Sequence, residues 1–374
     1  MSTSEVVRAT SAAPAATGVE AYAAFQATRT FGSLDGLRAI SILAVLWHHT
    51  DRGAGGSILN ARGFLGVDLF FVISGFLIVT LLLRERKRTG DISLKGFYFR
   101  RFLRIFPPYY LVLAVISLTA WLKPGHNSEA VLTQLPWSVF YLSNMVHMES
   151  GFLSITWSLS TEEQFYMVVP ALQKYAGRLF RWVLPALYVL VSLPPFGLFP
   201  DLPLPSFFRQ TTFGPILLGV MLAHLLDHPR AFARLWPVLG HRLATLGAAL
   251  LVVLALAQPA ADISGWPRVT IHWSMAVLLA TCVVRERHAL EPILKLWPMR
   301  RIGVVSYGIY LYHMLVWYFV DRAMQRLGLS SQPLFFVANT LGSWLVAELS
   351  FRYFETRVMS LRNRIGPDRA KVAT

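Results

Sequence analysis

The segment that decides the fold is GSLDGLRAISILAVLWHHT, which covers Gly32–Thr50. It has the length and apolar character of a membrane helix, because about 20 helical residues cross the hydrocarbon core of a bilayer. It nevertheless carries Asp35 and Arg38 near its start and His48 and His49 at its end. Ionisable groups are costly in hydrocarbon, so these residues are functional candidates by default.

The composition of the whole chain indicates a membrane protein. Its 374 residues are 55% hydrophobic and only 15% charged, with a mean hydropathy of +0.49, whereas about 25% of the residues of soluble domains are charged. We predict an all-α, polytopic integral membrane bundle of about ten transmembrane helices. The predicted spans are residues 31–50, 64–83, 105–122, 152–172, 182–200, 207–226, 243–258, 269–284, 302–320 and 334–354. A further stretch, 131–148, is interrupted by Pro136 and is predicted to be interfacial or re-entrant.

Lysine and arginine set the predicted orientation, because they accumulate in cytoplasmic loops. The segment Arg84–Arg104 holds eight of them, so we place it in the cytoplasm, and counting outward places both termini there. Loops of this kind account for the formal net charge of +15. No contiguous basic face with stacking aromatic residues is present, so nucleic-acid binding is not predicted.

One membrane domain is predicted to cover residues 31–356. The first 30 residues lack a continuous apolar core, so they do not resemble a signal peptide, and we expect a disordered cytoplasmic tail. Residues 357–374 are expected to be a basic cytoplasmic tail, too short to fold. The single cysteine, Cys282, lies in an apolar run and is predicted to be a packed thiol. No Cys/His set has metal-ligand spacing, so no metal is expected.

Arg38 and His49 are eleven positions apart in the first predicted span. At about 100° and 1.5 Å per residue, both side chains share one helix face and lie roughly 16 Å apart along the axis. Arg38 is then near the cytoplasmic boundary and His49 near the outer one. His48 points about 100° away from His49. The alternative is that Arg38 extends its charged head to the inner interface while the histidines cap the outer end.

The second predicted span, GFLGVDLFFVISGFLIV, places Asp68 at the same depth as His49. A carboxylate beside an imidazole fixes its tautomer and raises its basicity, as a general base requires. Asp68 is therefore a candidate catalytic residue. The alternative is that it caps the helix start or pairs with Arg62. Ser74 and Gly75 are predicted to be small packing residues at a close approach between helices.

A basic cluster precedes the third predicted span, in FYFRRFLRIFPPYY. Arg100, Arg101 and Arg104 lie on its cytoplasmic edge, and Pro107-Pro108 is expected to break the helix directly after them. Guanidinium groups hold phosphates through forked hydrogen bonds, so we predict that the cluster binds phosphate. The alternative is that its charge only sets the topology.

Two adjacent acids, Glu162 and Glu163, lie in ITWSLSTEEQFYMVVPAL. Ser158, Glu162 and Tyr166 recur every four residues and share a face, whereas Glu163 turns to the next one. Two carboxylates facing lipid would be too costly, so at least one is predicted to line an internal polar cavity. A purely structural pair with partner arginines is the alternative.

The ninth predicted span contains SYGIYLYHML, in which Ser306, Tyr310 and His313 share one face. His313 is a candidate acid or base, and Tyr310, like Glu162, is a candidate substrate contact. The alternative is that His313 is a buried packing residue.

Together these motifs resemble the acyltransferase-3 family of integral membrane O-acyltransferases. The matching stretches, in the family's order, are LDGLRAISILAVLWHH, GVDLFFVISGFLI, FRRFLRIFPPYY, WSLSTEEQFY and SYGIYLYH. The resemblance implies about ten helices and transfer of acyl groups from cytoplasmic acyl-CoA to hydroxyls of sugars or related acceptors. Acetyl-CoA is the default donor, and no permanently bound cofactor is expected. The expected location is the plasma membrane, in bacteria the inner membrane.

The resemblance also assigns functional positions. The family's essential arginine–histidine pair, its basic motif and its paired acids carry over to Arg38 and His49, to Arg100, Arg101 and Arg104, and to Glu162 and Glu163. One departure concerns Glu355, because Arg357 stands where the family usually has proline. The helix is then expected to continue into the tail, which leaves a role for Glu355 open. Some members carry an extracytoplasmic hydrolase-like domain, and none is expected in this chain.

The resulting hypothesis is that the arginines hold the phosphates of CoA while the pantetheine arm spans the distance to His49. His49 then acts as general base on an acceptor hydroxyl or forms an acyl-imidazole, oriented by Asp68 or Glu163. The expected partners are acyl-CoA, a carbohydrate or glycosylated acceptor and the lipid bilayer. A secondary transporter of a small polar or anionic substrate is the alternative, and a sensor that binds acyl-CoA without turnover is a third possibility.

Overall fold

The structure, a computed structural model, describes residues 17–51, 57–123, 125–193, 213–259, 263 and 265–365. Within these ranges it is helical and contains no strand, which confirms the predicted all-α class. The helices are α1 (Gly18–Ala27), α2 (Gly32–His49), α3 (Ile58–Arg62), η1 (Gly63–Leu65), α4 (Gly66–Thr89), α5 (Leu94–Leu122), α6 (His126–Val139), η2 (Ser143–Met145), α7 (Gly151–Ser154), α8 (Thr156–Tyr175), α9 (Gly177–Ser192), α11 (Gly214–Asp227), α12 (Pro229–Leu239), α13 (Ala244–Ala257), α14 (Trp266–Val284), α15 (Glu291–Leu294), α16 (Trp297–Val304), α17 (Ser306–Arg326), α18 (Gln332–Ser350), the π-helical turn η4 (Phe351–Glu355) and α19 (Thr356–Ile365).

Each predicted span overlaps one of these helices, although residues 194–200 and 207–212 lie outside the described ranges. Four helical stretches, Ile58–Thr89, Leu94–Leu122, Trp266–Val284 and Gln332–Leu361, are long and apolar enough to cross a membrane. The number rises to seven if three helix pairs bent by 72° to 82° each count as one span. The chain is therefore a helical membrane protein, and the total of ten spans and the cytoplasmic termini stay predictions.

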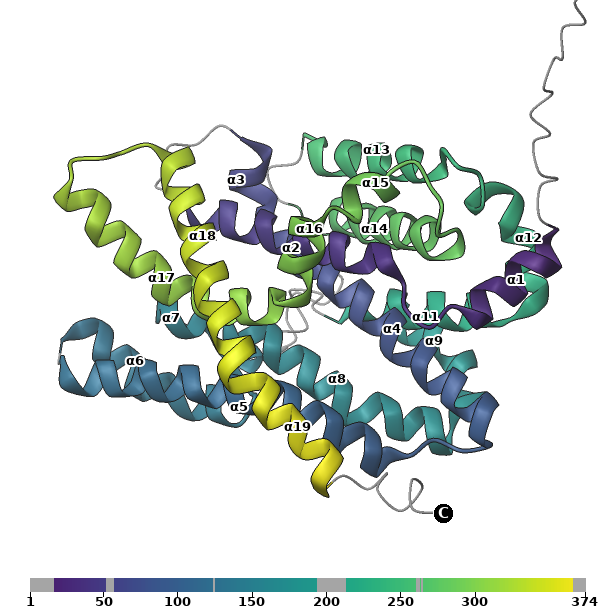
Figure 1. Ribbon diagram of the computed structural model, residues 1–374, viewed down its shortest axis with the longest axis horizontal. Coiled ribbons are helices and arrows are strands. Elements are labelled where there is room, and N and C mark those ends of the chain that lie inside the picture. Colours follow the sequence, from purple (N-terminus) through teal and green to yellow (C-terminus); the bar gives the residue numbers. More distant parts are fainter. Residues whose placement is uncertain are drawn as a thin grey trace, which may run out of the picture.

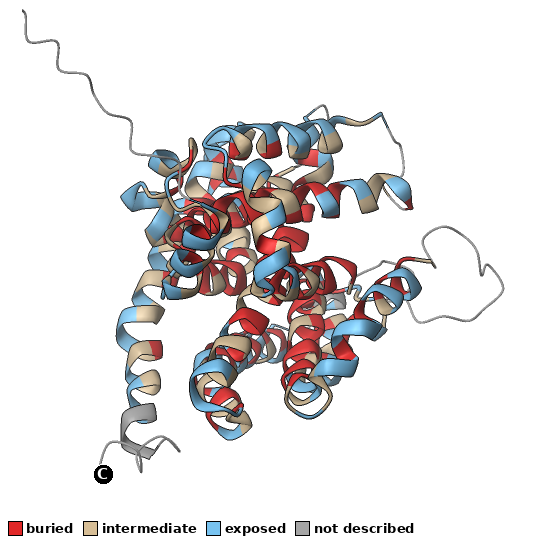
Figure 2. Ribbon diagram, turned by 90° about the vertical axis from the view of Figure 1, so that its right-hand side faces the viewer, coloured by how far each residue is buried: buried red, intermediate tan, exposed pale blue. Residues whose placement is uncertain are grey.

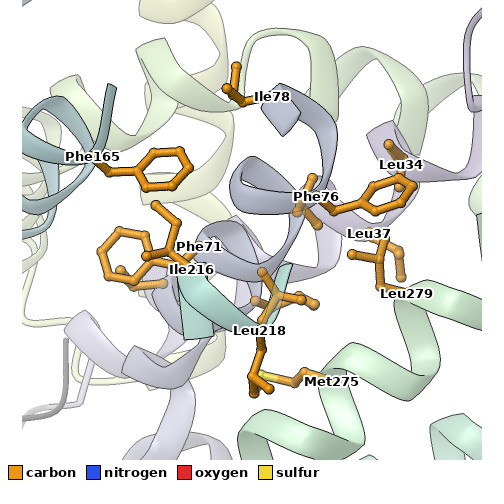
Figure 3. Close-up of a cluster of buried hydrophobic side chains, with 14 of the residues drawn as sticks. Leu34, Leu37, Phe71, Phe76, Ile78, Phe165, Ile216, Leu218, Met275 and Leu279 are labelled. Carbon is orange, nitrogen blue, oxygen red and sulfur yellow. The ribbon is translucent and has the colours of Figure 1, made fainter. Parts of the chain in front are cut away.

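Helix α4 lies at the centre of the bundle, in contact with α2, α8, α11 and α14 (Figure 1). Buried residues gather on the inner helices, and exposed residues cover the outer ones (Figure 2). The core around α4 is drawn in Figure 3 and includes Leu34, Leu37, Phe71, Phe76, Ile78, Phe165, Ile216, Leu218, Met275 and Leu279.

Two glycines bring the backbones of α4 and α11 together. A Cβ atom at Gly75 would overlap the carbonyl oxygen of Ile216, and one at Gly219 would overlap that of Val72. Small residues permit this approach, which gains van der Waals contact where a bilayer supplies no hydrophobic driving force between helices. The packing role predicted for Gly75 is therefore confirmed.

Four expectations about chain termini and breaks are corrected. Helix α1 lies within the predicted disordered tail and packs on α12, where Phe25 and Phe232 have ring centres 5.3 Å apart. Helix α5 continues through Pro107-Pro108. Helix α6 likewise continues past Pro136 to Val139. At the carboxyl end, α18, η4 and α19 form one long rod (Figure 1), which confirms that the helix continues past Arg357. The expectation that the tail is too short to fold is corrected, because it is helical to Ile365. Residues 1–16 and 366–374 lie outside the described residues.

The glycine contact predicts the effect of a single methyl group. Gly75→Ala is expected to lower the free energy of unfolding by about 1–3 kcal/mol, because the new Cβ forces α4 and α11 apart. The measurement is denaturant-induced unfolding of the purified protein in detergent. Gly247→Ala in α13 is the matched control, since nothing lies within 4 Å of that position. Equal stability of the two variants would contradict the close approach.

Candidate active site

A cavity of about 110 Å³ lies between α2, α4, α5, α8 and α17, and we call it the central cavity. All five helices carry sequence motifs that were singled out as functional candidates. The polar residues that line it are Arg38, Ser74, Arg101, Arg104, Ser158, Glu162, Tyr166, Ser306, Tyr307 and Tyr310. Folding therefore joins five motifs that are far apart in the chain.

Three guanidinium groups from two helices face the central cavity. Arg38 of α2 forms an ion pair with Asp35 at 3.0 Å. Arg101 of α5 lies over the Tyr166 ring, 4.7 Å from its centre, and Arg104 follows one turn later. Arg101 and Arg104 also line a second space of about 300 Å³, which we call the side cavity. Arg100 lines only the side cavity.

Glu162 is the carboxylate that lines the central cavity. It accepts hydrogen bonds from the hydroxyl groups of Ser74 and Tyr166. Ser158, Glu162 and Tyr166 all line this cavity, so the face predicted from their spacing is confirmed. Glu163 is buried and does not line the central cavity. It is close enough to Glu162 and Arg101 for their charges to act on its carboxyl group. Ser74 was expected to be a packing residue, and the structure corrects this.

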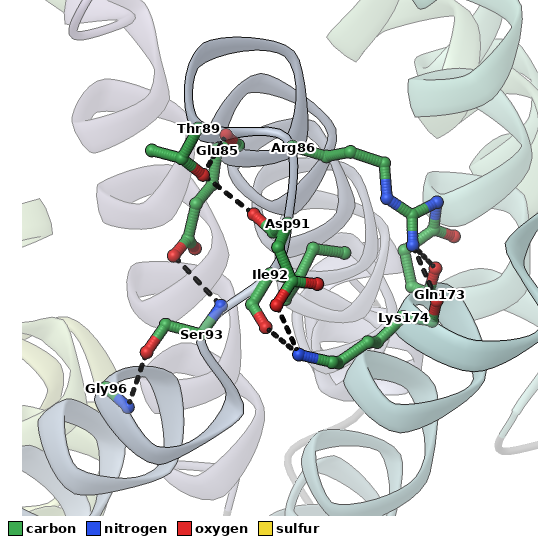
Figure 4. A network of polar contacts seen from close by, with 9 residues as sticks. All are labelled: Glu85, Arg86, Thr89, Asp91, Ile92, Ser93, Gly96, Gln173 and Lys174. Carbon is green, nitrogen blue, oxygen red and sulfur yellow. Dashed lines mark hydrogen bonds and ion pairs between the residues drawn. The ribbon is translucent and has the colours of Figure 1, made fainter.

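The connection between α4 and α5 fixes the start of the basic helix (Figure 4). Arg86 donates to the backbone oxygens of Gln173 and Lys174, at 2.6 and 2.7 Å, at the end of α8. Lys174 pairs with Asp91 at 2.6 Å, and this hydrogen bond lowers the pKa of the Asp91 carboxyl. Ser93, whose backbone N–H donates to Glu85, caps the amino end of α5. These contacts hold α5 against α4 and α8.

Two imidazoles meet at the opposite end of α2. The rings of His49 and His313 have centres 5.0 Å apart. His49 Nδ1 lies 2.9 Å from the carbonyl oxygen of Val45, and His313 Nδ1 lies 2.6 Å from that of Tyr310. A carbonyl oxygen only accepts, so each Nδ1 carries the proton and each Nε2 keeps its lone pair. The Nε2 atom of His313 is buried without a hydrogen-bond partner among the described residues.

The histidine pair lies outside the central cavity. Tyr310 is the last residue of α17 that lines it, and His313 is one turn farther along, with the two rings 5.5 Å apart. The Tyr310 hydroxyl donates to the Ile155 carbonyl at 3.0 Å and shares a 2.7 Å hydrogen bond with Ser158. Tyr310 therefore closes the cavity on the side of the histidines.

Asp68 does not orient His49, contrary to expectation. Its carboxylate is buried and lies 3.0 Å from Arg268 and 2.9 Å from His272, both on α14. Arg62, its expected partner in the alternative interpretation, donates to the backbone oxygens of Leu256 and Gln258. In a low-dielectric interior a carboxylate is stable when it is paired and hydrogen-bonded. Asp68 thus joins α4 to α14.

Glu163 also lies apart from the histidine pair. Among the described residues, the His49 ring has a hydrogen bond with the Val45 carbonyl and ring contacts with His48 and His313, and none of these partners is a carboxylate. Backbone carbonyls, not carboxylates, therefore fix both tautomers.

The sequence did not reveal a role for Arg268 or His272, and the role of Glu355 was left open. The signal for the first two was their i, i+4 spacing at the start of an apolar run, since intramembrane ionisable residues require partners. Glu355 ends the π-helical turn, is buried, accepts a 2.8 Å hydrogen bond from Ser350 and lies in the electrostatic neighbourhood of Arg104. Single-turn π-helices frequently accompany functional sites.

Comparison with known proteins links this arrangement to a family. The model of an acyltransferase domain, acyltransferase 3, matches residues 31–348. A putative O-acetyltransferase of Staphylococcus aureus (strain COL) is 28% identical over 365 residues, which cover 89% of this chain and 58% of that protein. The peptidoglycan O-acetyltransferase of Listeria monocytogenes is 28% identical over 362 residues, 87% of this chain and 55% of that protein. The chain thus spans little more than half the length of these relatives. No solved structure matches it.

The environment of Asp68 predicts a structural role. Asp68→Ala is expected to lower the free energy of unfolding by about 3–5 kcal/mol, because it leaves Arg268, whose side chain is only 13% exposed, without a counter-charge. The measurement is denaturant unfolding in detergent, with Glu129→Ala on the exposed surface of α6 as the control. A stable Asp68→Ala protein that has lost its activity would instead support a catalytic Asp68.

Proposed function

Because the chain belongs to the acyltransferase-3 family, whose domain model spans residues 31–348, we propose that it transfers an acetyl group from acetyl-CoA to a hydroxyl of a carbohydrate. The observation that carries this proposal is the excess of positive charge in the central cavity. Arg38, Arg101 and Arg104 line it, and Glu162 is its one carboxylate among the described residues.

The central and side cavities, which share lining residues, suit a phosphorylated donor. Arg101 and Arg104 line both, and Arg100 adds a further guanidinium on the side cavity. Guanidinium groups grip phosphates through paired hydrogen bonds, and in a medium of low dielectric such contacts are strong. The phosphates of CoA would bind in the side cavity, with the acyl thioester directed into the central one.

The size of the central cavity favours a short acyl group. Its volume of about 110 Å³ is below the ~150 Å³ of an engineered cavity that admits benzene. An acetyl group fits within this volume.

The histidine pair supplies the base. The Nε2 atom of His49 would take the proton of the acceptor hydroxyl as that oxygen attacks the thioester carbonyl carbon. The carbon–sulfur bond then breaks, and the proton passes to the departing CoA thiolate. A neutral His313 at 5.0 Å would orient His49 or receive the proton. An acyl-imidazole on His49 leads to the same products by two steps.

The acceptor class rests on the relatives. One of them is named a peptidoglycan O-acetyltransferase, which supports a cell-wall glycan or another surface carbohydrate as acceptor. With Arg84–Arg104 in the cytoplasm, the histidine pair lies toward the outer side of the plasma membrane, where such an acceptor is available.

Substitution of His49 tests both its proposed role as general base and the proposed carbohydrate acceptor. His49→Ala is expected to reduce acetyl transfer by about 10²–10⁴-fold, the usual contribution of a general base, while the protein stays folded. Mass spectrometry of surface glycans from cells that express each variant measures the acetyl group directly. His48→Ala is the control, because the His48 Nδ1 contacts the Asn60 carbonyl instead of His313. An active His49→Ala protein beside an inactive His48→Ala protein would overturn the assignment.

Arg101→Gln tests the donor site. Loss of one charge-assisted hydrogen bond costs about 1.5–3 kcal/mol, so the KM for acetyl-CoA is expected to rise roughly 10- to 100-fold. Steady-state kinetics of the reconstituted protein provide the measurement. Arg88→Gln at the exposed end of α4 is the control, since Arg88 lines neither cavity. A KM that changes equally in both variants would refute a specific phosphate contact.

A further inference from the structure

A third cavity, of about 490 Å³, lies where the ends of α4, α8 and α11 meet the starts of α9 and α12. We call it the α9 cavity. It shares no lining residue with the central or side cavity, so it is a separate site.

The α9 cavity carries unbalanced positive charge. Its one lining acid among the described residues, Asp227, already pairs with Lys87 at 2.6 Å. Arg86 is held by the two backbone oxygens at the end of α8. Arg178 and Arg181, one turn apart on α9, also line the cavity, and neither has an ion-pair partner in the part of the chain that the structure describes. Both guanidinium groups are exposed and available to an anion.

The wall of the cavity adds features of a built ligand site. Helix α9 begins at Gly177 without a side-chain cap, so its first N–H groups present a positive end. Beside it lies Gln173, which is 1% exposed and whose Oε1 has no hydrogen-bond partner among the described residues. His224 Nε2 is likewise buried without a described partner. The cavity thus combines donors for a phosphate with two lining side chains, Gln173 and His224, that each carry a buried polar atom without a described partner.

The outer face of α9 indicates where the rest of the ligand lies. Leu179 and Trp182 are 66% and 73% exposed, and Arg181 lies 5.4 Å from the centre of the Trp182 ring. Tryptophan is enriched at the level of lipid headgroups, and basic residues near the cytoplasmic leaflet attract anionic lipids. An apolar surface next to a basic cavity of about 490 Å³ matches an acyl chain next to its phosphate-containing headgroup.

We propose that the α9 cavity binds the headgroup of an anionic, hydroxyl-bearing phospholipid, with the phosphate on Arg178, Arg181 and the start of α9 and a headgroup hydroxyl on Gln173. The acyl chains lie along Leu179 and Trp182. The site is independent of the donor and acceptor sites of acetyl transfer.

Lipid retention tests the proposal. The purified full-length protein in detergent is mixed with phosphatidylglycerol and phosphatidylcholine in equal amounts, and native mass spectrometry counts the molecules retained. Wild type is expected to retain phosphatidylglycerol in preference. Arg178→Gln/Arg181→Gln is expected to retain it about tenfold less, because two forked phosphate contacts are lost. Arg181→Gln alone is expected to show an intermediate loss.

The matched control is Arg230→Gln/Arg234→Gln, two exposed arginines on the neighbouring α12 that do not line the α9 cavity. It is expected to match wild type. Equal losses in both double variants, or equal retention of the two lipids by wild type, would overturn the proposal. A different outcome would assign the cavity to a free phosphate compound instead. In that outcome, millimolar inorganic phosphate displaces phosphatidylglycerol, and additional phosphatidylglycerol does not restore its preferential retention.

Discussion

The bundle depends on the close backbone approaches that glycines allow along α4. Gly66 admits the carbonyl oxygen of Ser41 in α2, and Gly75 admits that of Ile216 in α11. Inside a bilayer, helices associate through packing and hydrogen bonds, so such approaches hold a helix in register. The same register places Ser74 on Glu162 and Asp68 on the α14 pair. The positions of both polar groups therefore follow from where glycines allow the backbones to meet.

The two polar groups along α4 differ in how their charge is balanced. Asp68 is matched by Arg268 and a hydrogen bond to His272, so this centre is complete and serves to join helices. The central cavity collects three arginines around Glu162, with Glu355 in the electrostatic neighbourhood of Arg104. Like charges at close range in a low dielectric repel strongly. An anionic donor would relieve that repulsion, so charge imbalance distinguishes the proposed substrate site from the structural pair.

The spacing of residues within single helices explains how much of the candidate site could be predicted from the sequence. The spacing of Ser158, Glu162 and Tyr166 fixes one helix face without knowledge of the fold. The partner of Asp68 lies 200 residues away on α14, and no pattern within a single span indicates it. The prediction that prolines break these helices was wrong for a different reason. Neighbouring helices and local adjustments satisfy the backbone groups that proline frees in membrane helices, so α5 continues where a soluble helix would end.

The position of Tyr310 between the central cavity and the histidine pair bears on the proposed reaction. Its hydroxyl is held by the Ile155 carbonyl and Ser158, and hydrogen bonds of this kind contribute about 1 kcal/mol each. The free energy needed to break these two hydrogen bonds is therefore within what several arginine–phosphate contacts supply. In the proposed reaction, the thioester meets His49 and His313 only after Tyr310 leaves these oxygens.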